Sequence, residues 1–324
     1  MYSLEDITLE HPRISGLQTR VARVGSGPIA LFIHGWPECW YSWRRQMVAL
    51  ANAGYTAIAP DMPGFGETQA LPSIEDYNVT RIAGFMQELV DHYSPGTPVL
   101  LIGHDWGAIN CWQFVQLHPE RVQRLVIMSV PLRPVADVPP IEFLRGYFKE
   151  QFFYQIYFQE PGVAEAEFDE DPEGILRALY CSPDTPRHPP LLGKSTSEGG
   201  GWIGRLGVPK EQPKWLTDEM LDYYIAAYLH SGFAGGINYY RNFDENWRRL
   251  LPWRNSTIKC PVLFIAGAAD SVIQGADESA LRGMMGRRIP NLQIELLPKI
   301  GHWLQNEAPE AVNEVLSSFV VQQA

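Results

Sequence analysis

The chain has 324 residues, 45% of them hydrophobic, which is enough to bury one large core or a core that carries an insertion. Its formal net charge of −11 opposes binding to phosphate backbones and anionic lipids, so we expect no nucleic-acid partner and no membrane contact. No segment approaches the roughly 20 apolar residues that span a bilayer, and residues 1–10 lack a signal-peptide stretch, so we expect a cytoplasmic protein.

Short apolar runs alternate with helical patterns over the first 130 residues. Strands are predicted at residues 21–24, 29–33, 56–59, 99–102 and 125–128, and several are continuously apolar, as in parallel strands buried on both faces. Apolar residues at helical spacing predict a helix over 79–93, and a second helix over 111–117 ends before Pro119. This alternation predicts a mostly parallel sheet with crossover helices.

The middle third of the chain breaks this rhythm. No buried strand is evident over residues 131–255, where helical pieces such as 216–229 occur, and strands resume at 262–266 and 292–297. We therefore predict a core domain of residues 1–131 and 256–324 with a helical cap, residues 132–255, inserted over the carboxyl edge of the sheet. An independent second domain is the alternative. Residues 183–207, rich in Pro and Gly, are predicted to be a mobile cap loop.

A candidate nucleophile follows the fourth predicted strand. The sequence runs from an apolar strand into Gly103-His-Asp-Trp-Gly107 and then into a helix, the context of a nucleophile elbow, where Ser is the usual central residue. The glycines permit a sharp turn, and a helix N-terminus stabilises an anion. An ordinary helix cap is the alternative, but it needs neither two glycines nor a preceding strand. A carboxylate nucleophile, here Asp105, attacks saturated carbon and forms an alkyl ester.

A histidine follows the last predicted strand. His302 is a candidate general base, because histidine is suited to gain a proton near neutral pH. The acid that orients it should follow an earlier strand. Asp270 does so after a glycine-containing turn, whereas Asp277 lies further from the strand end and is the weaker candidate. The chain order of Asp105, Asp270 and His302 is that of nucleophile, acid and base in the hydrolase fold.

The residues His34-Gly-Trp-Pro37 directly follow the second predicted strand, which ends at Ile33. In the hydrolase fold a loop at this place supplies one backbone N–H of the oxyanion hole, here that of Trp36, and the residue after the nucleophile, Trp106, supplies the other. Each such donor stabilises the tetrahedral intermediate by about 3–4 kcal/mol. We expect His34 to be a structural, hydrogen-bonded histidine, and the sequence leaves the role of His104 open.

These core motifs resemble those of two families. His34-Gly-Trp-Pro37, Gly103-His-Asp-Trp-Gly107, Asp270 and Gly301-His302 are similar to the motifs of the α/β-hydrolase-fold epoxide hydrolases. They also resemble those of haloalkane dehalogenases, which share an Asp nucleophile followed by Trp. The core motifs alone therefore leave both activities open.

Two cap segments favour the epoxide hydrolases. Residues 153–162 and 232–242 resemble the segments of soluble epoxide hydrolases that carry two epoxide-activating tyrosines, and the resemblance covers nearly the whole chain. It implies that Tyr154 and Tyr240 fill these roles, and that Tyr157 and Tyr239 pack behind them. A phenol can protonate the alkoxide that ring opening produces. Tyrosines that only line the cap are the alternative.

The resemblance implies an α/β-hydrolase fold: a mostly parallel eight-stranded sheet flanked by helices, with an inserted helical cap. It implies hydrolysis of an epoxide to a vicinal diol through an ester on Asp105, with a water activated by His302 and Asp270. The alternative is a haloalkane dehalogenase with the same nucleophile, and a third hypothesis is a ligand-binding protein without catalytic activity.

The same resemblance carries the remaining expectations. Four side chains are expected to contact the substrate: Trp36, Trp106, Gln155 and His104. Glu38 is expected to position the water. No metal or organic cofactor is expected, since the chemistry needs none and the four cysteines show no CxxC pair. The expected partner is a small apolar epoxide, and a homodimer is left open.

Overall fold

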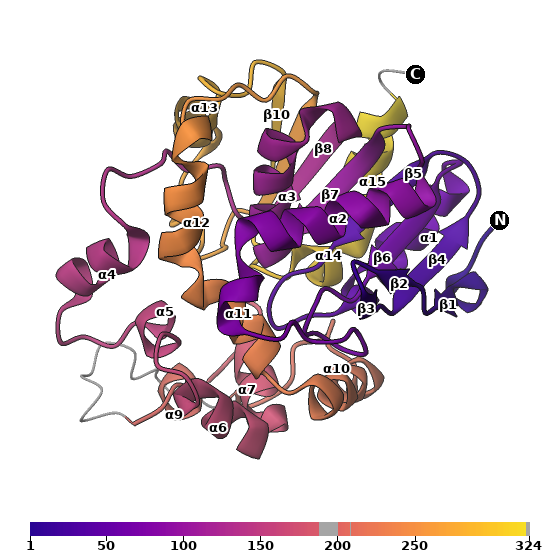
Figure 1. The fold of residues 1–324 in the computed structure, drawn as a ribbon. Helices are drawn as coiled ribbons and strands as arrows, with labels where there is room; N and C mark the ends of the chain where they lie inside the picture. Colours follow the sequence, from indigo (N-terminus) through magenta and orange to yellow (C-terminus); the bar gives the residue numbers. More distant parts are fainter. Residues whose placement is uncertain (188–199, 208, 322–324) are drawn as a thin grey trace.

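An eight-stranded sheet runs through the molecule in the order β1-β4-β6-β5-β7-β8-β9-β10 (Figure 1). The computed structural model describes residues 1–187, 200–207 and 209–321. The strands are β1 (Thr8–Glu10), β4 (Val21–Gly25), β5 (Ile29–Ile33), β6 (Thr56–Pro60), β7 (Val99–His104), β8 (Val122–Met128), β9 (Val262–Gly267) and β10 (Leu292–Leu297). Within this sheet only the β1–β4 and β4–β6 pairs are antiparallel. The predicted mostly parallel sheet is confirmed, and β1 is a strand that the sequence pattern did not predict.

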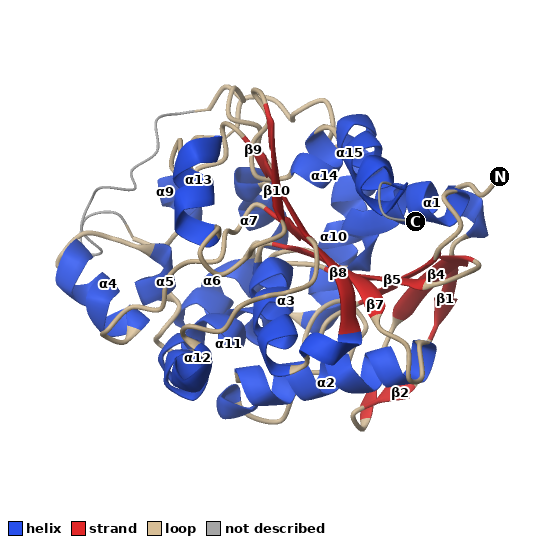
Figure 2. Ribbon diagram, turned by 90° about the horizontal axis from the view of Figure 1, so that it is seen from above, coloured by secondary structure: helices blue, strands red, loops and turns tan. Residues whose placement is uncertain are grey.

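Helices cover both faces of the sheet (Figure 2). One face carries α2 (Val79–Tyr93), α3 (Trp106–Leu117) and α13 (Glu278–Met285); the other carries α1 (Arg44–Asn52), α14 (Leu304–Glu307) and α15 (Pro309–Val321). Successive strand residues point to opposite faces, so Leu31 and Ile33 join the first core and Phe32 joins the second. The central strands are buried on both sides, which explains why they are continuously apolar.

Between β8 and β9 the described residues form helices and add no strand to the sheet. In Figure 1 these helices, which we call the cap helices or the cap, lie together on one side of the sheet. They are α4 (Pro140–Phe148), α5 (Tyr154–Tyr157), α6 (Val163–Glu170), α7 (Pro172–Leu179), α9 (Ile203–Leu206), α10 (Asp218–Ser231), α11 (Ala234–Arg241) and α12 (Phe243–Leu250). The domain division at residues 131 and 256 stays a prediction.

The predicted cap loop at 183–207 needs one correction. Its last residues form α9, so that part is helical, because Glu167 accepts hydrogen bonds from the backbone N–H groups of Trp202 and Ile203 at the start of this helix. Residues 188–199 of the predicted loop lie outside the described part of the chain.

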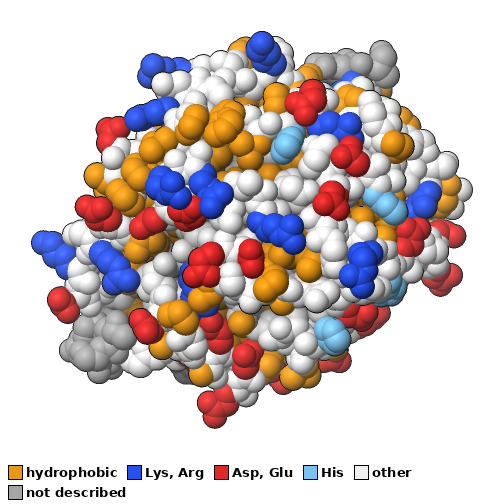
Figure 3. Space-filling model, in the orientation of Figure 1, with side chains coloured by type: hydrophobic (Ala, Val, Ile, Leu, Met, Phe, Trp, Pro, Cys, Tyr) orange, Lys and Arg blue, Asp and Glu red, His pale blue; other side chains and the backbone are white. Residues whose placement is uncertain are grey.

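Short elements fill the remaining connections. They are the hairpin of β2 (Arg13–Ile14) and β3 (Leu17–Gln18) and the 3-10 helices η1 (Leu4–Asp6), η2 (Trp40–Trp43), η3 (Ile74–Tyr77), η4 (Pro119–Arg121) and η5 (Leu251–Trp253). Within the described ranges, every helix is too short or too polar to cross a bilayer. Lys and Arg side chains are interspersed with Asp and Glu over the face shown in Figure 3.

Candidate active site

Asp105 lies at a sharp turn between the end of β7 and the start of α3. Its backbone has φ 51° and ψ −118°, a conformation that non-glycine residues rarely adopt. A Cβ atom at Gly107 would lie 1.9 Å from the carbonyl oxygen of Ile33. A Cβ atom at Gly103 would lie 2.4 Å from the carbonyl oxygen of Gly107. Strand, turn and helix therefore pack too closely for any residue but glycine at these two positions, as the elbow motif predicted.

The two carboxylate oxygens of Asp105 have different surroundings. Oδ1 accepts a hydrogen bond from the backbone N–H of Trp36 at 2.8 Å. Oδ2 lies 3.7 Å from Nε2 of His302, and the side chains of Asp105 and His302 are 16% and 19% exposed. One oxygen is thus held by the backbone, whereas the other lies beside the histidine. Trp106 begins α3, where the first backbone N–H groups have no partner inside the helix.

His302 is bound on its other side by Asp270. Nδ1 of His302 lies 3.1 Å from Oδ2 of Asp270, whose Oδ1 accepts from the backbone N–H of Val272 at 2.9 Å. Asp277, the weaker candidate, instead caps the start of α13. Ser129 was not among the predicted site residues, but its hydroxyl contacts both Asp270 and His302. A polar residue directly after β8, at the carboxyl edge of the sheet, was the signal that could have found it.

The charges of this group favour an ionised acid and a protonated base. Burial opposes ionisation of Asp270, but His302, Ser129 and the Val272 N–H outweigh burial and lower the pKa of Asp270. Burial likewise acts to lower the pKa of His302, but the carboxylates of Asp270 and Asp105 outweigh it and raise this pKa to about 9. The charge on Asp105 therefore contributes to the basicity of His302.

Tyr154 and Tyr240 come from two cap helices, α5 and α11, and their ring centroids are 5.9 Å apart. The Tyr240 ring contacts the ring of Trp106 edge-on at 4.9 Å, and the Tyr154 hydroxyl accepts a hydrogen bond from Nε2 of Gln155 at 2.9 Å. Burial and the charge of Asp105 raise the pKa of both phenols. Both hydroxyls therefore stay protonated, and both interact electrostatically with the carboxylate of Asp105.

The neighbouring cap tyrosines donate their hydroxyl protons elsewhere. Tyr157 donates to Oε2 of Glu167 at 2.9 Å, and Tyr239 donates to the carbonyl oxygen of Pro63 at 3.2 Å. Each phenol thus has a structural acceptor. This geometry agrees with the choice of Tyr154 and Tyr240 over Tyr157 and Tyr239 as candidate proton donors.

Comparison with known proteins identifies the family. A sequence model described as the alpha/beta hydrolase fold matches residues 28–309. Epoxide hydrolase A of Mycobacterium tuberculosis is 39% identical over 94% of this chain and 95% of its own length. Epoxide hydrolase 2 of Siraitia grosvenorii is 38% identical over 96% and 98%. The chain belongs to the epoxide hydrolases of the α/β-hydrolase fold.

Solved structures of this epoxide hydrolase family have the same fold. The crystal structure of epoxide hydrolase A from Mycobacterium thermoresistibile superposes with a TM-score of 0.89 at 36% identity, covering 98% of both chains. An epoxide hydrolase from Vigna radiata gives a TM-score of 0.85 at 32% identity, covering 99% of this chain and 100% of its own. Core and cap are therefore arranged as in other epoxide hydrolases.

Behind His302 of this epoxide hydrolase lies a fully buried polar group. Nδ1 of His104 is 2.8 Å from Oε2 of Glu38, and its Nε2 is 2.9 Å from the carbonyl oxygen of His302. Glu38 also accepts from the Gly35 N–H and from Gln305. Burial opposes ionisation of Glu38, but His104 outweighs it and holds the pKa of this carboxyl below its usual range.

This group bears on two predictions. His104 was expected to contact the substrate, but its side chain is 0% exposed behind His302 and has no surface to offer a ligand. Glu38 is also 0% exposed, and both of its carboxylate oxygens bond to protein groups. Its role in positioning the water stays a prediction. His34 has a structural environment, with Nδ1 2.8 Å from the Gly35 carbonyl oxygen and Nε2 accepting from the Met62 N–H.

The ring of Trp36 belongs to the contact between core and cap. It is 4% exposed and lies between cap aromatic rings, including Phe158 at 5.4 Å and Trp202 at 5.8 Å, while its backbone N–H holds Asp105. Trp202, which the sequence analysis did not single out, stacks on the Tyr154 ring at 4.7 Å and 9°. Trp36 and Trp202 therefore support the cap side of the site through their rings.

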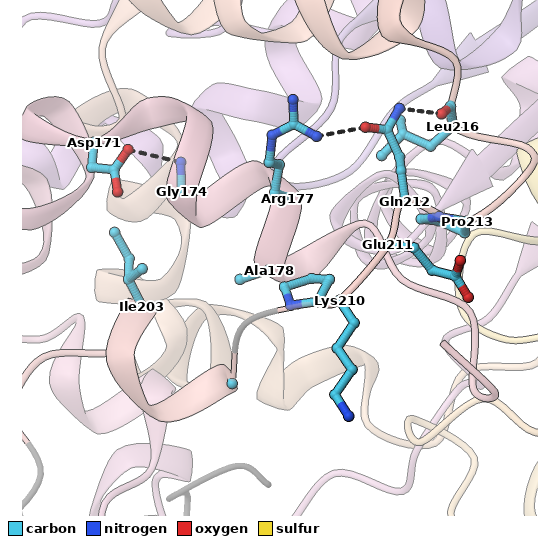
Figure 4. A pocket seen from close by; sticks show the side chains of 12 residues that line it. Asp171, Gly174, Arg177, Ala178, Ile203, Lys210, Glu211, Gln212, Pro213 and Leu216 are labelled. Carbon is cyan, nitrogen blue, oxygen red and sulfur yellow. Dashed lines mark hydrogen bonds between the residues drawn. The ribbon is translucent and has the colours of Figure 1, made fainter. Parts of the chain in front are cut away.

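A cavity of about 360 Å³ lies elsewhere in the cap (Figure 4). It is bounded by α7, α9 and the segment that precedes α10, and Arg177 donates to Gln212 at its wall. None of its lining residues is one of the predicted site residues. The reactive groups meet instead around Asp105, away from this cavity.

Proposed function

We propose that this protein hydrolyses epoxides to vicinal diols through a covalent ester on Asp105. One observation carries the proposal: the carboxylate of Asp105 lies at a strained elbow with Oδ1 held by the Trp36 N–H and Oδ2 beside His302. Two cap phenols, Tyr154 and Tyr240, complete the group. A fixed carboxylate together with two protonated phenol O–H donors suits an electrophilic carbon that bears a leaving oxygen.

Ring opening uses the nucleophile and the two phenols. Oδ2 of Asp105 attacks one epoxide carbon, because Oδ1 is already engaged with the Trp36 N–H. Tyr154 and Tyr240 donate to the epoxide oxygen, since burial and the Asp105 charge keep both hydroxyls protonated. One phenol delivers its proton to the alkoxide that forms, and the product is a β-hydroxyalkyl ester.

Hydrolysis of the ester uses the histidine. Esterification removes the negative charge of Asp105, so the pKa of His302 falls and its neutral form becomes available as a base. His302, oriented by Asp270, then takes a proton from water, which attacks the carbonyl carbon of the ester. Oδ1 becomes the oxyanion, and the backbone N–H groups of Trp36 and Trp106 stabilise it. His302 then gives its proton to Oδ2, which leaves as a hydroxyl of the diol, and the remaining proton of the added water restores the phenol.

The site suits an apolar substrate. Aromatic rings of Trp106, Tyr154, Trp202 and Tyr240 surround the predicted position of the epoxide, and Gln155 bonds to the Tyr154 hydroxyl. We infer that the substrate carries an apolar or aromatic group beside the epoxide. Cytoplasmic location and a homodimer stay predictions from the sequence.

A single-turnover experiment in water enriched in oxygen-18 tests the proposal. Purified protein in excess is mixed with styrene oxide or with a short 1-haloalkane, and the peptide that contains residue 105 is then analysed by mass spectrometry. Diol formation with label in Asp105 and without halide release is the expected result, because water attacks the ester at its carbonyl carbon. The variant Asp105→Ala should show neither turnover nor label, and His302→Gln should accumulate the ester.

Other outcomes would contradict the proposal. Halide release without diol would make the protein a haloalkane dehalogenase and would reduce the two tyrosines to lining residues. Diol that carries the oxygen-18 label, with none in Asp105, would mean direct attack of water on the epoxide.

A further inference from the structure

Ser129 directly follows β8 and lies at the centre of the acid–base group. Its side chain is buried, with 0% of the residue exposed. Its hydroxyl oxygen is 2.5 Å from Oδ2 of Asp270 and 2.9 Å from Nδ1 of His302, closer to Nδ1 than the carboxylate oxygen is at 3.1 Å. Ser129 therefore contacts both members of the pair.

The single proton of the Ser129 hydroxyl fixes the direction of its hydrogen bonds to Asp270 and His302. An ionised carboxylate only accepts, so the single hydroxyl proton of Ser129 goes to Asp270. The hydroxyl can then offer only lone pairs to Nδ1 of His302, which must carry the proton of this bond. Ser129 and Asp270 thus share the Nδ1 proton. In the neutral histidine this leaves the lone pair on Nε2, which faces Asp105.

The backbone of Ser129 holds the hydroxyl in this place at a cost. Its φ is 72°, a left-handed conformation that residues with a side chain rarely adopt. The backbone N–H donates to the carbonyl oxygen of Ile265 on β9 at 2.9 Å, which ties the strained residue to the neighbouring strand. Strain of this kind persists where the surrounding structure imposes it, and it gathers at functional sites.

We propose that Ser129 is a positioning residue for ester hydrolysis, acting through Asp270 and His302. Its hydroxyl holds the Asp270 carboxylate and shares the Nδ1 proton, so that the imidazolium formed during water attack has two acceptors. The proposal rests on the proposed function, because it assigns Ser129 to the second step of that mechanism. Ring opening by Asp105 does not use His302 as a base, so that step does not need Ser129.

The variants Ser129→Ala and Ser129→Gly test this assignment. Both remove the hydroxyl, but glycine also relieves the positive φ, so the pair separates the hydroxyl from the backbone strain. Formation and hydrolysis of the ester are measured separately by rapid quench under single turnover. We expect hydrolysis to slow roughly 10- to 100-fold in both variants, the effect of losing a hydrogen bond to a charged group, with ester formation within about threefold of wild type.

The steady state supplies a second readout. If only hydrolysis slows, kcat and KM fall together and kcat/KM is kept, a pattern that general loss of packing does not produce. Ser94→Ala is the matched control: Ser94 is also buried, but its hydroxyl donates to the Thr97 carbonyl oxygen at 2.9 Å, away from the site. This control should keep both rates.

Three results would overturn the assignment of Ser129. They are hydrolysis at the wild-type rate in both variants, wild-type hydrolysis in Ser129→Gly alone, and equal slowing of ester formation and hydrolysis. A wild-type protein that turns epoxide into diol without any ester on Asp105 would overturn the covalent mechanism, and the role of Ser129 with it.

Discussion

The change Asp105→Asn makes the same change in charge as ester formation, without any substrate. The amide is neutral and has the shape of the carboxylate, and its oxygen can still accept from the Trp36 N–H. In the wild type, the charge of Asp105 helps to raise the pKa of His302 to about 9. In Asp105→Asn, His302 should therefore have the lower pKa that it has when Asp105 is esterified.

The size of this effect follows from the distance. Nε2 of His302 and Oδ2 of Asp105 are 3.7 Å apart. At this separation, two unit charges attract by about 1 kcal/mol in bulk water and by about 4 kcal/mol at the effective dielectric constant of a protein surface. Since 1.36 kcal/mol corresponds to one pKa unit, the pKa of His302 should fall by about 1 to 3 in Asp105→Asn.

Histidine-selective NMR titration measures this pKa, with the His302 signal assigned from its loss in His302→Gln. Asp277→Asn is the matched control, because Asp277 caps α13 and does not contact His302. Mass spectrometry checks that residue 105 remains an amide. A His302 pKa that is equal in Asp105→Asn and the wild type would refute the idea that esterification releases the base. The rate of ester hydrolysis should correspondingly rise to its plateau as pH increases through the lower value.

Three further predictions address the proton donors, the elbow and the buried charge. Tyr154→Phe combined with Tyr240→Phe should slow ester formation by roughly 10²- to 10⁴-fold, measured by rapid quench, and a wild-type rate would place the proton donor elsewhere. Gly107→Ala should lower the free energy of unfolding by more than about 3 kcal/mol in a denaturant titration, because its Cβ would lie 1.9 Å from a backbone oxygen. Gly84→Ala in α2 is the control: its Cβ would meet nothing within 4 Å, so this variant should be as stable as the wild type or more stable. Glu38→Gln should be less stable than the wild type above pH 4.5, the ordinary pKa of Glu, because ionised Glu38 stabilises the fold through its contact with His104. As pH falls below 4.5, wild-type Glu38 becomes protonated and the two unfolding free energies should converge. A stability difference that does not change with pH would contradict this prediction.

Much of the fold could be predicted from local sequence patterns. The strand at 29–33 matches β5 and that at 292–297 matches β10, and the other predicted strands differ from the observed ones by one to three residues at an end. Continuously apolar runs identify strands that are buried on both faces, because no polar residue is tolerated on either side. The three-residue β1 escaped prediction, since its residues are mostly exposed and its pairing with β4 is a long-range contact.

The sequence by itself determined the reactive groups of this protein. Glycines around Asp105, a histidine after the last strand and an acid after an earlier one are local patterns, because an elbow and strand ends are built from neighbouring residues. The choice of Asp270 over Asp277 could be argued from the distance along the chain to the strand end, and the structure shows that Asp270 contacts His302.

Only the tertiary structure decided which side chains touch. Ser129 contacts His302, which lies 173 residues further along the chain, whereas His104 is buried behind His302. Both lie at the same edge of the sheet, because His104 ends β7 and Ser129 directly follows β8. Sequence shows which residue follows a strand, but the direction of its side chain depends on backbone dihedral angles and on packing between distant segments. The raised pKa of His302 has the same origin, since it depends on carboxylates that only the fold brings within about 4 Å.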